Sequence, residues 1–380
     1  MEIKSKLPHT ETSIFAIMSA YAAKYGAINL SQGFPDFPIS KTLIDKVYQK
    51  MLEGHNQYAP MPGVPVLRRQ IAEKMKALYG ADYDWETEIT MTAGATQALY
   101  TAITAFIHPG DEAVIFEPSY DSYQPAVEIN GGTVKPVAVH APDFKVDWDK
   151  VKDTINAKTK LIIFNTPNNP TGSLFYKEDL EALQEITRGT DIVVISDEVY
   201  EHIIFDGHQH QSAALFSELA QRTLIMYSFG KTFHATGWKL GYAVGPEKLM
   251  NAFRQIHQFI VFTVNTPIQL AIAEYLENPE HYLHLPEFYQ QKRDFFLQSI
   301  EGSRFKPLKC LGTYFQLLDY SEISDMPELE FAKYLTREYG VASIPLSPFY
   351  HDKKDQKLLR FCFAKTEETL AKAGEILRKI

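Results

Sequence analysis

Four short segments carry side chains whose types and spacing could support chemistry on one ligand. They read Ala-Gly-Ala-Thr-Gln over residues 93–97, Asn-Thr-Pro-Asn-Asn-Pro-Thr-Gly over 165–172, Ser-Asp-Glu-Val-Tyr over 196–200 and Ser-Phe-Gly-Lys-Thr over 228–232. Each is placed where a predicted strand ends, and ligands collect at the carboxyl ends of strands in open α/β sheets. We therefore expect the four segments to meet at one site.

Lys231 is the first candidate for covalent chemistry. It lies just past an apolar run, between Gly230 and Thr232, where a side-chain amine could reach a crevice and form a Schiff base. Asp197 ends another apolar run, so its carboxylate could pair with a protonated pyridine nitrogen, and Tyr200 could hydrogen-bond a ring oxygen. The ordinary alternatives are a solvated lysine, a helix-capping or salt-bridged aspartate, and a tyrosine packed in the core.

A phosphate could bind where Gly94, Ala95 and Thr96 open a predicted helix. Free N–H groups and the helix dipole favour an anion at such an end. Thr96 and Ser228 would add hydroxyl groups, and Lys239 would add a positive charge. The alternative interpretation of the Gly-Ala-Thr sequence is a plain helix start.

Two further side chains fit the same ligand. Tyr120 follows another apolar run and could stack on a flat ring, although core packing explains it equally well. Arg360 lies inside the strand-like run 358–363, where burial demands a partner. It could clamp a substrate carboxylate or form an internal salt bridge. Together these residues indicate a ligand with a phosphate, a pyridine-type nitrogen and an aldehyde.

Strand and helix patterns alternate through the middle of the chain. Several strands are continuous apolar runs, typical of a mostly parallel sheet covered by helices on both faces. The class is therefore α/β, and a smaller α+β domain is predicted from about residue 305. Strands are predicted over 88–92, 113–117, 133–139, 161–165, 192–197, 224–228, 313–318 and 359–363, and helices over 10–25, 41–52, 66–78, 95–107, 122–130, 178–187, 266–278, 289–300 and 367–380.

Length and composition exclude several classes of protein. The chain has 380 residues, enough for two or three domains. Its net charge of −9 disfavours a nucleic-acid partner, and no apolar run approaches the ~20 residues that span a bilayer, so no membrane partner is expected. The two cysteines form no CxxC pair, and we expect a cytoplasmic protein. His208-x-His210 is interpreted as a solvated loop, and no metal site is predicted.

The motifs, taken in order, resemble those of the pyridoxal-phosphate-dependent aminotransferases of fold type I, class I/II. Asn-x-x-x-Asn-Pro-x-Gly, Ser-Asp-Glu-Val-Tyr, Ser-Phe-Gly-Lys-Thr and Gly-Trp-Lys-x-Gly occur in this order, and matches extend over about residues 29–363. Gln32-Gly-Phe-Pro-Asp-Phe37 is similar to the branch that holds kynurenine/glutamine and bacterial methionine aminotransferases. The resemblance implies a mostly parallel, seven-stranded sheet flanked by helices, with a smaller α+β domain formed by the N- and C-terminal parts.

The resemblance also implies how pyridoxal 5'-phosphate is held. Lys231 would be the Schiff-base lysine and proton shuttle, and Asp197 would pair with the pyridine nitrogen. Tyr200 and Asn169 would bond the ring oxygen, and Tyr120 would stack on the ring. The residues implied to hold the phosphate are Gly94, Ala95, Thr96, Ser228 and Lys239.

Substrate and partner contacts follow from the same resemblance. Arg360 and Asn169 would hold the substrate carboxylate, and Phe15 and Gly33 would lie near the substrate side chain. Tyr58 is expected to reach the phosphate bound by the partner subunit, so a homodimer with shared sites is implied. The implied domains are residues 1–45 (N-terminal arm and part of the small domain), 46–283 (large cofactor-binding domain) and 284–380 (C-terminal small domain).

The implied reaction is ping-pong transamination between an amino acid and a 2-oxo acid. Residues 258–267, which line the site in relatives, contain no basic residue that could bind a second carboxylate. Phe15, Tyr58, Phe262 and Val264 offer an apolar and aromatic surface. We therefore expect methionine and aromatic amino acids as donors, with glutamine and kynurenine as further candidates.

Three alternative functions differ from transamination in features that an assay or the sequence can test. A cysteine-conjugate C–S β-lyase could use the same residues and would form pyruvate without an added keto acid. A transcriptional sensor would need a DNA-binding domain, for which a chain whose motifs begin near residue 29 leaves no room. A nicotinamide oxidoreductase is disfavoured because no G-x-G-x-x-G fingerprint occurs.

Overall fold

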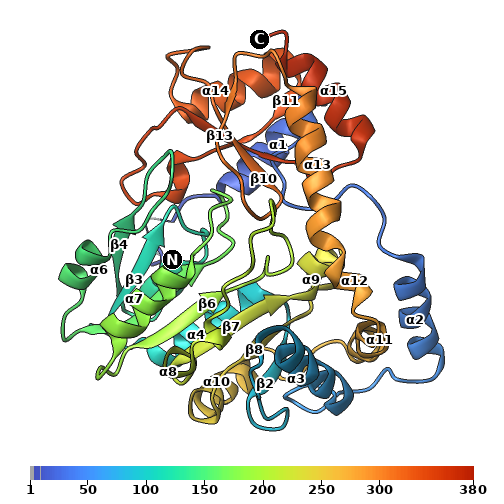
Figure 1. The fold of residues 1–380 in the computed structure, drawn as a ribbon, viewed down its shortest axis with the longest axis vertical. Coiled ribbons are helices and arrows are strands. Elements are labelled where there is room, and N and C mark those ends of the chain that lie inside the picture. Colours follow the sequence, from blue (N-terminus) through green and yellow to red (C-terminus); the bar gives the residue numbers. More distant parts are fainter. Residues whose placement is uncertain (1–3, 9) are drawn as a thin grey trace.

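A seven-stranded sheet forms the centre of the molecule (Figure 1). The computed structural model describes residues 4–8 and 10–380, and the strand order is β2-β8-β7-β6-β5-β3-β4. Only β8 is antiparallel to its neighbours in this sheet. The predicted α/β fold with a mostly parallel sheet is confirmed. The strands are β2 (Ile89–Thr92), β3 (Glu112–Glu117), β4 (Thr133–Ala138), β5 (Thr159–Asn165), β6 (Val193–Asp197), β7 (Thr223–Ser228) and β8 (Gly241–Val244).

Helices cover both faces of this sheet because its strands bury apolar side chains on both. Val114 and Ile162 pack into one core, whereas the adjacent Ile115 and Ile163 pack into the other. The second core includes α4 (Ala95–Phe106), α5 (Tyr123–Ile129) and α10 (Glu247–Ile260). The first includes α2 (Lys41–Leu52), α3 (Pro65–Tyr79), α6 (Trp148–Thr154), α7 (Lys177–Thr187), α8 (Ser217–Ala220), α11 (Thr266–Leu276) and α12 (Glu280–Leu283).

Two elements between residues 241 and 260 were not predicted. β8 has four residues and pairs antiparallel with both β2 and β7, so its place depends on two strands far from it in sequence. α10 buries Leu249, Met250, Phe253 and His257 along one face. This spacing is helical, and the pattern could have been found.

The N- and C-terminal parts pack together beside the large sheet, at the top of Figure 1. β1 (Ile28–Asn29) pairs in parallel with β11 (Val341–Ala342), which joins the two ends of the chain. An antiparallel sheet follows the order β12-β13-β10-β9. Its strands are β9 (Lys306–Pro307), β10 (Phe315–Asp319), β12 (Ile344–Pro345) and β13 (Leu358–Cys362), and the helices of this part are α1 (Ile14–Tyr25), α13 (Leu285–Ser299), α14 (Glu328–Tyr334) and α15 (Glu367–Leu377).

The smaller α+β part built from both ends of the chain is thereby confirmed, while the boundaries at residues 45 and 283 stay a prediction. α13 extends from the large sheet to this part in Figure 1. Within residues 4–8 and 10–380, no helix is long and apolar enough to cross a membrane.

Candidate active site

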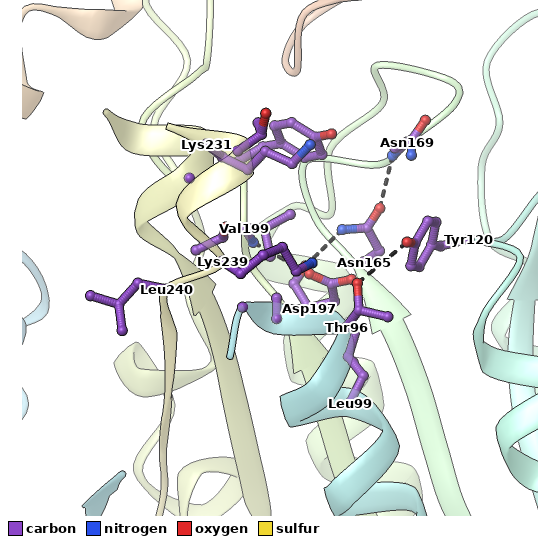
Figure 2. A pocket seen from close by; sticks show the side chains of 16 residues that line it. Thr96, Leu99, Tyr120, Asn165, Asn169, Asp197, Val199, Lys231, Lys239 and Leu240 are labelled. Carbon is purple, nitrogen blue, oxygen red and sulfur yellow. Dashed lines mark hydrogen bonds between the residues drawn. The ribbon is translucent and has the colours of Figure 1, made fainter. Parts of the chain in front are cut away.

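The four chemistry-bearing segments meet at one edge of the large sheet. Because β2, β5, β6 and β7 are parallel, their carboxyl ends deliver residues 93–97, 165–172, 196–200 and 228–232 to the same place. Figure 2 shows the cavity that they form. It is lined by Gly94, Ala95, Thr96, Leu99, Tyr120, Asn165, Asn169, Asp197, Val199, Tyr200, Ser228, Gly230, Lys231, Thr236, Lys239 and Leu240.

Asp197 is the buried acid of the cavity. Burial raises the pKa of its carboxyl to about 6, although the Tyr123 hydroxyl donates to Oδ2 at 2.5 Å and opposes that rise. The Val199 N–H donates to Oδ1 at 3.4 Å. No lysine or arginine forms an ion pair with Asp197 in the described chain, so neither ordinary alternative, salt bridge or helix cap, accounts for it. A cationic ligand would stabilise this carboxylate.

Lys231 lies in α9 (Phe229–Thr232), one short turn after β7. Burial lowers the pKa of its amine to about 8, so the neutral form is accessible near neutral pH. Its Nζ donates to the Tyr314 hydroxyl at 2.8 Å and lies 3.4 Å from the Gly33 carbonyl oxygen. Lys231 is therefore an amine of lowered pKa that faces the cavity, and the interpretation as a solvated lysine is wrong.

The other end of the cavity is built to receive an anion. α4 begins at Ala95 with no side chain capping its first N–H groups. Gly94 has φ +78° and ψ 167°, a conformation that is essentially restricted to glycine, and a Cβ there would lie 3.3 Å from Lys239 Nζ. The Lys239 amine therefore sits directly over the helix start, with the Thr96 and Ser228 side chains in the same lining.

Arg360 is a fully buried cation in β13 and forms no ion pair with a carboxylate of residues 4–8 or 10–380. Its guanidinium donates to Asn169 Oδ1 at 2.7 Å and to the Ser31 carbonyl at 2.8 Å, and Nε has no partner in the described chain. The Phe315 ring lies 3.8 Å from the guanidinium carbon. Burial lowers its pKa to about 10. The internal salt bridge is thus not formed, and an anionic group would compensate the buried charge.

Four predicted residues lie outside the cavity lining: Arg360, Gly33, Phe15 and Tyr58. The Gly33 carbonyl still touches Lys231, and the Phe15 ring lies 5.1 Å from the Arg360 guanidinium, so both are near the site. Tyr58 is 84% exposed and lies with Thr263–Pro267 around a separate surface hollow. Residues 258–267 do not line the Lys231 cavity of their own chain.

The structure adds three residues to the site that are not among the predicted ones: Tyr123, Asn165 and Tyr314. Tyr123 and Tyr314 are fully buried and bond Asp197 and Lys231 directly. Asn165 bridges the backbones of Asp197 and Asn169, with its amide donating to the Asp197 carbonyl and its Oδ1 accepting from the Asn169 N–H, both at 2.8 Å. Asn165 belongs to one of the quoted motifs, whereas Tyr123 and Tyr314 lie in the predicted helix 122–130 and the predicted strand 313–318, where packing alone explains an aromatic residue.

The solvated-loop interpretation of His208-x-His210 was half wrong. His208 is exposed, but the His210 side chain is buried and its Nε2 lies 2.8 Å from Glu198 Oε2. The interaction with the buried Glu198 carboxylate keeps the His210 imidazole out of solvent. Over residues 4–8 and 10–380, no three His, Cys, Asp or Glu side chains gather in a group able to hold a metal ion.

The chain is similar to known proteins along its whole length. A sequence model described as "Aminotransferase class I and II" matches residues 25–377. The chain belongs to this family. It is 49% identical to the methionine aminotransferase of Escherichia coli (strain K12), over 99% of this chain and 98% of that one.

Two further comparisons agree with the family assignment. A solved Escherichia coli structure, described as having a methionine aminotransferase function, superposes with a TM-score of 0.98 at 49% identity and covers 100% of both chains. Human kynurenine–oxoglutarate transaminase 1 is 34% identical over 94% of this chain and 93% of its own. The chain is therefore an aminotransferase that depends on pyridoxal phosphate.

The cavity fits pyridoxal phosphate in its chemistry. Uncapped N–H groups and Lys239 suit the phosphate, and the buried Asp197 carboxylate has no cationic partner among the described residues. Lys231 supplies the amine that an aldehyde requires. The substitution of a side chain at Gly94 would crowd the phosphate end, which explains why glycine stands there.

Proposed function

We propose that this aminotransferase moves the amino group of methionine, and of aromatic amino acids, to a 2-oxo acid. The observation that carries the choice of donor is 49% identity to a methionine aminotransferase over 99% of the chain. The site's geometry agrees with an amino-acid substrate because Arg360, which is buried and has no counterion in the described part of the chain, lies near the reactive lysine. Glutamine and kynurenine are further candidate donors, the latter because of the kynurenine transaminase relative.

The predicted residues of the cavity lining then have roles toward the cofactor. Asp197 would hold a protonated ring nitrogen, Tyr200 and Asn169 would bond the ring oxygen, and Tyr120 would lie against the ring. The Tyr123 hydroxyl donates to one Asp197 oxygen, and the other oxygen, which the Val199 N–H contacts at 3.4 Å, has a further lone pair that can accept from the ligand. The residues proposed to hold the phosphate are Gly94, Ala95, Thr96, Ser228 and Lys239.

Lys231 is proposed to carry the proton during transamination. When bound, pyridoxal phosphate supplies an aldehyde that takes up the amino group and a ring that accepts the electron pair released at the substrate carbon. The freed Lys231 amine takes a proton at Nζ and returns it within the same cavity. A pKa lowered to about 8 suits both steps, because the amine exchanges protons readily near neutral pH.

One group of residues is proposed to bind the substrate carboxylate, and another to contact the substrate side chain. Arg360 and Asn169 would bind the carboxylate, with the arginine fork matching its two oxygens. Phe15 would lie beside the substrate side chain with the Gly33 backbone. The segment 258–267 contains no basic residue, which favours an apolar substrate over a dicarboxylate.

We also infer a homodimer that shares its sites. Tyr58 is 84% exposed and Phe259 is 86% exposed, and the Tyr58 and Phe262 rings pack edge to face at 5.6 Å. Exposed aromatic side chains gathered in this way are typical of protein interfaces. A second copy of the chain would cover them and would receive Tyr58 near its own phosphate site.

The proposed location is the cytoplasm.

A donor comparison tests the proposed substrate. Methionine, phenylalanine, tyrosine, glutamine, kynurenine and aspartate would each be assayed with the same 2-oxo acid. We expect the highest kcat/KM for methionine or an aromatic donor, and turnover of aspartate much better than methionine would contradict the proposal. A cysteine S-conjugate supplied without a 2-oxo acid tests the β-lyase alternative, which the reported relatives do not support and which would form pyruvate.

A further inference from the structure

Tyr314 contacts the reactive lysine from a distant part of the chain. It is fully buried directly before β10, and its hydroxyl lies 2.8 Å from Lys231 Nζ. The same hydroxyl donates to the Gly33 carbonyl at 2.7 Å, and Nζ lies 3.4 Å from that carbonyl. A lysine, a tyrosine and a backbone carbonyl therefore form a closed triangle at the edge of the cavity.

The numbers of protons and lone pairs on these three groups determine which group donates each hydrogen bond. A phenol has one proton, and burial raises the pKa of Tyr314 well above its ordinary value, so that proton stays on the oxygen. Because it is donated to Gly33, the hydroxyl can only accept from Lys231. The carbonyl can likewise only accept. Both partners of Nζ are thus acceptors, and Nζ must direct N–H bonds toward them.

We infer that Tyr314 is a positioning residue for Lys231, which orients the free amine for proton transfer. This inference rests on the proposed function of Lys231. A neutral amine has two N–H bonds and one lone pair. With its N–H bonds directed at Tyr314 and Gly33, the lone pair points away from both, into the cavity. A proton that binds to this lone pair forms an N–H bond that is not donated to Tyr314 or Gly33. It is therefore the proton that Nζ can transfer back into the cavity.

The backbone beside Tyr314 is held in an unusual conformation. Thr313 has φ +65°, in the left-handed region that a β-branched residue rarely adopts. The Thr313 N–H donates to the Ile203 carbonyl at 3.0 Å, and the Gly312 N–H donates to the Gly172 carbonyl at 3.0 Å. A Cβ at Gly312 would lie 2.7 Å from Pro167. The segment is therefore clamped against the cofactor loops, and Tyr314 is held in place.

Other groups also affect the Lys231 amine and must be kept constant. Its pKa depends first on burial, and the rings of Tyr200 and Tyr314 lie within 5.4 Å of Nζ. The titratable and charged groups that face it from the surrounding elements are Asp197, Tyr200, Lys239, Tyr314, Arg360 and Cys362. A Tyr314→Phe substitution removes one hydroxyl and leaves the others in place.

The direct test measures the Lys231 amine in cofactor-free protein. Reductive methylation of Lys231 with formaldehyde would be followed by peptide mass spectrometry as a function of pH. The Tyr314 oxygen stabilises the ammonium form, so in Tyr314→Phe we expect the half-maximal labelling rate at a pH about one unit lower. An unchanged or raised midpoint would overturn the inference.

Tyr289→Phe is the matched control. Tyr289 is also fully buried and its ring lies 5.7 Å from that of Tyr314, but its hydroxyl bonds His234 Nδ1 at 2.9 Å. We expect this variant to keep the wild-type midpoint. If both variants shift it equally, Tyr314 acts only through packing and the inference fails. If Tyr314→Phe does not fold, 3-fluorotyrosine at position 314 weakens the acceptor and should lower the midpoint in the same direction.

A second readout uses the loaded enzyme and methionine. In Tyr314→Phe we expect kcat to fall about tenfold, with KM unchanged and a larger isotope effect for α-deuterated methionine. A rise in KM with kcat unchanged would contradict a role in proton transfer. The labelling experiment needs no substrate, so a wild-type enzyme that ignores methionine would refute the proposed donor without affecting the Tyr314 result.

Discussion

Arg360 shows how one residue defines the class of substrate. Its fully buried guanidinium has amide, carbonyl and aromatic neighbours but no carboxylate within ion-pair distance in the described chain. We predict that Arg360→Lys, which keeps the charge but loses the fork, lowers kcat/KM for methionine about 100-fold, mainly through KM. Steady-state kinetics tests this, and Arg360→Lys should leave the cofactor absorbance unchanged. An unchanged KM would contradict the assignment.

Asp197 leads to a prediction about pH. Burial raises its folded-state pKa from an ordinary value of 3.8 to about 6, so the folded protein binds a proton that the unfolded chain releases. Stability of the cofactor-free protein should therefore fall as pH rises through this window. Asp197→Asn removes this loss, and its free energy of unfolding relative to wild type should increase by about 1 kcal/mol between about pH 5 and about pH 8.

Urea unfolding of the two cofactor-free proteins at the two pH values measures this difference. With pyridoxal phosphate bound the order should reverse, because only the carboxylate can pair with a cationic ring nitrogen. A variant that is less stable than wild type by the same amount at both pH values would show that Asp197 carries no buried charge penalty.

Among the site residues, those that directly follow or end a strand could be predicted from the sequence. Lys231 and Asp197 each come at the end of an apolar run, so their position could be predicted. Tyr123 and Tyr314 touch them from residues 74 and 83 positions away in the chain. An aromatic residue in an apolar region is explained by packing alone, and only the tertiary structure reveals the hydrogen bond.

At the scale of elements, the start of α4 gives the next prediction. Gly94→Ala would place a methyl group 3.3 Å from Lys239 Nζ and strain a backbone at φ +78°. We expect affinity for pyridoxal phosphate to fall at least about tenfold, because the phosphate end is crowded and Lys239 is displaced. Equilibrium titration with the cofactor measures this change.

Gly80→Ala is the matched control for that variant. Gly80 also has positive φ, +64°, after α3, but a Cβ there would meet nothing within 4 Å. It should lose about 1 kcal/mol of stability and keep its cofactor affinity. Equal losses of affinity in both variants would mean that general destabilisation, not the phosphate end, explains the effect.

The elements themselves were predicted unevenly. α2 begins and ends at the predicted residues 41 and 52, and the parallel strands were recognisable as apolar runs. β8 was missed because four residues carry little pattern and its antiparallel place between β2 and β7 is decided by tertiary pairing. Two-residue strands such as β1 and β11 were likewise not predictable, because they are defined only by their pairing with each other.

At the scale of the whole molecule, the shared-site dimer can be tested by complementation. A Lys231→Ala subunit keeps Tyr58, and a Tyr58→Ala subunit keeps Lys231. If each site combines Lys231 of one subunit with Tyr58 of the other, a mixed dimer has one intact site. Refolding the two inactive variants together in equal amounts should restore about one quarter of wild-type activity.

Sedimentation of a Phe259→Glu variant complements that test. Phe259 is 86% exposed in the single chain, so a charge there would be harmless to a monomer and should dissociate a dimer that buries it. Activity no higher than the sum of the separate variants, in a refolded mixture that does form mixed dimers, would contradict shared sites.

The most direct test of the account is an absorbance titration of the purified protein. With pyridoxal phosphate bound, we predict a visible band that depends on Lys231 and is absent from Lys231→Ala. The band should fade when L-methionine is added and return when a 2-oxo acid follows, which would demonstrate both halves of the reaction. A protein that shows no such band even after addition of pyridoxal phosphate, or whose band is unaffected by methionine, would contradict the account.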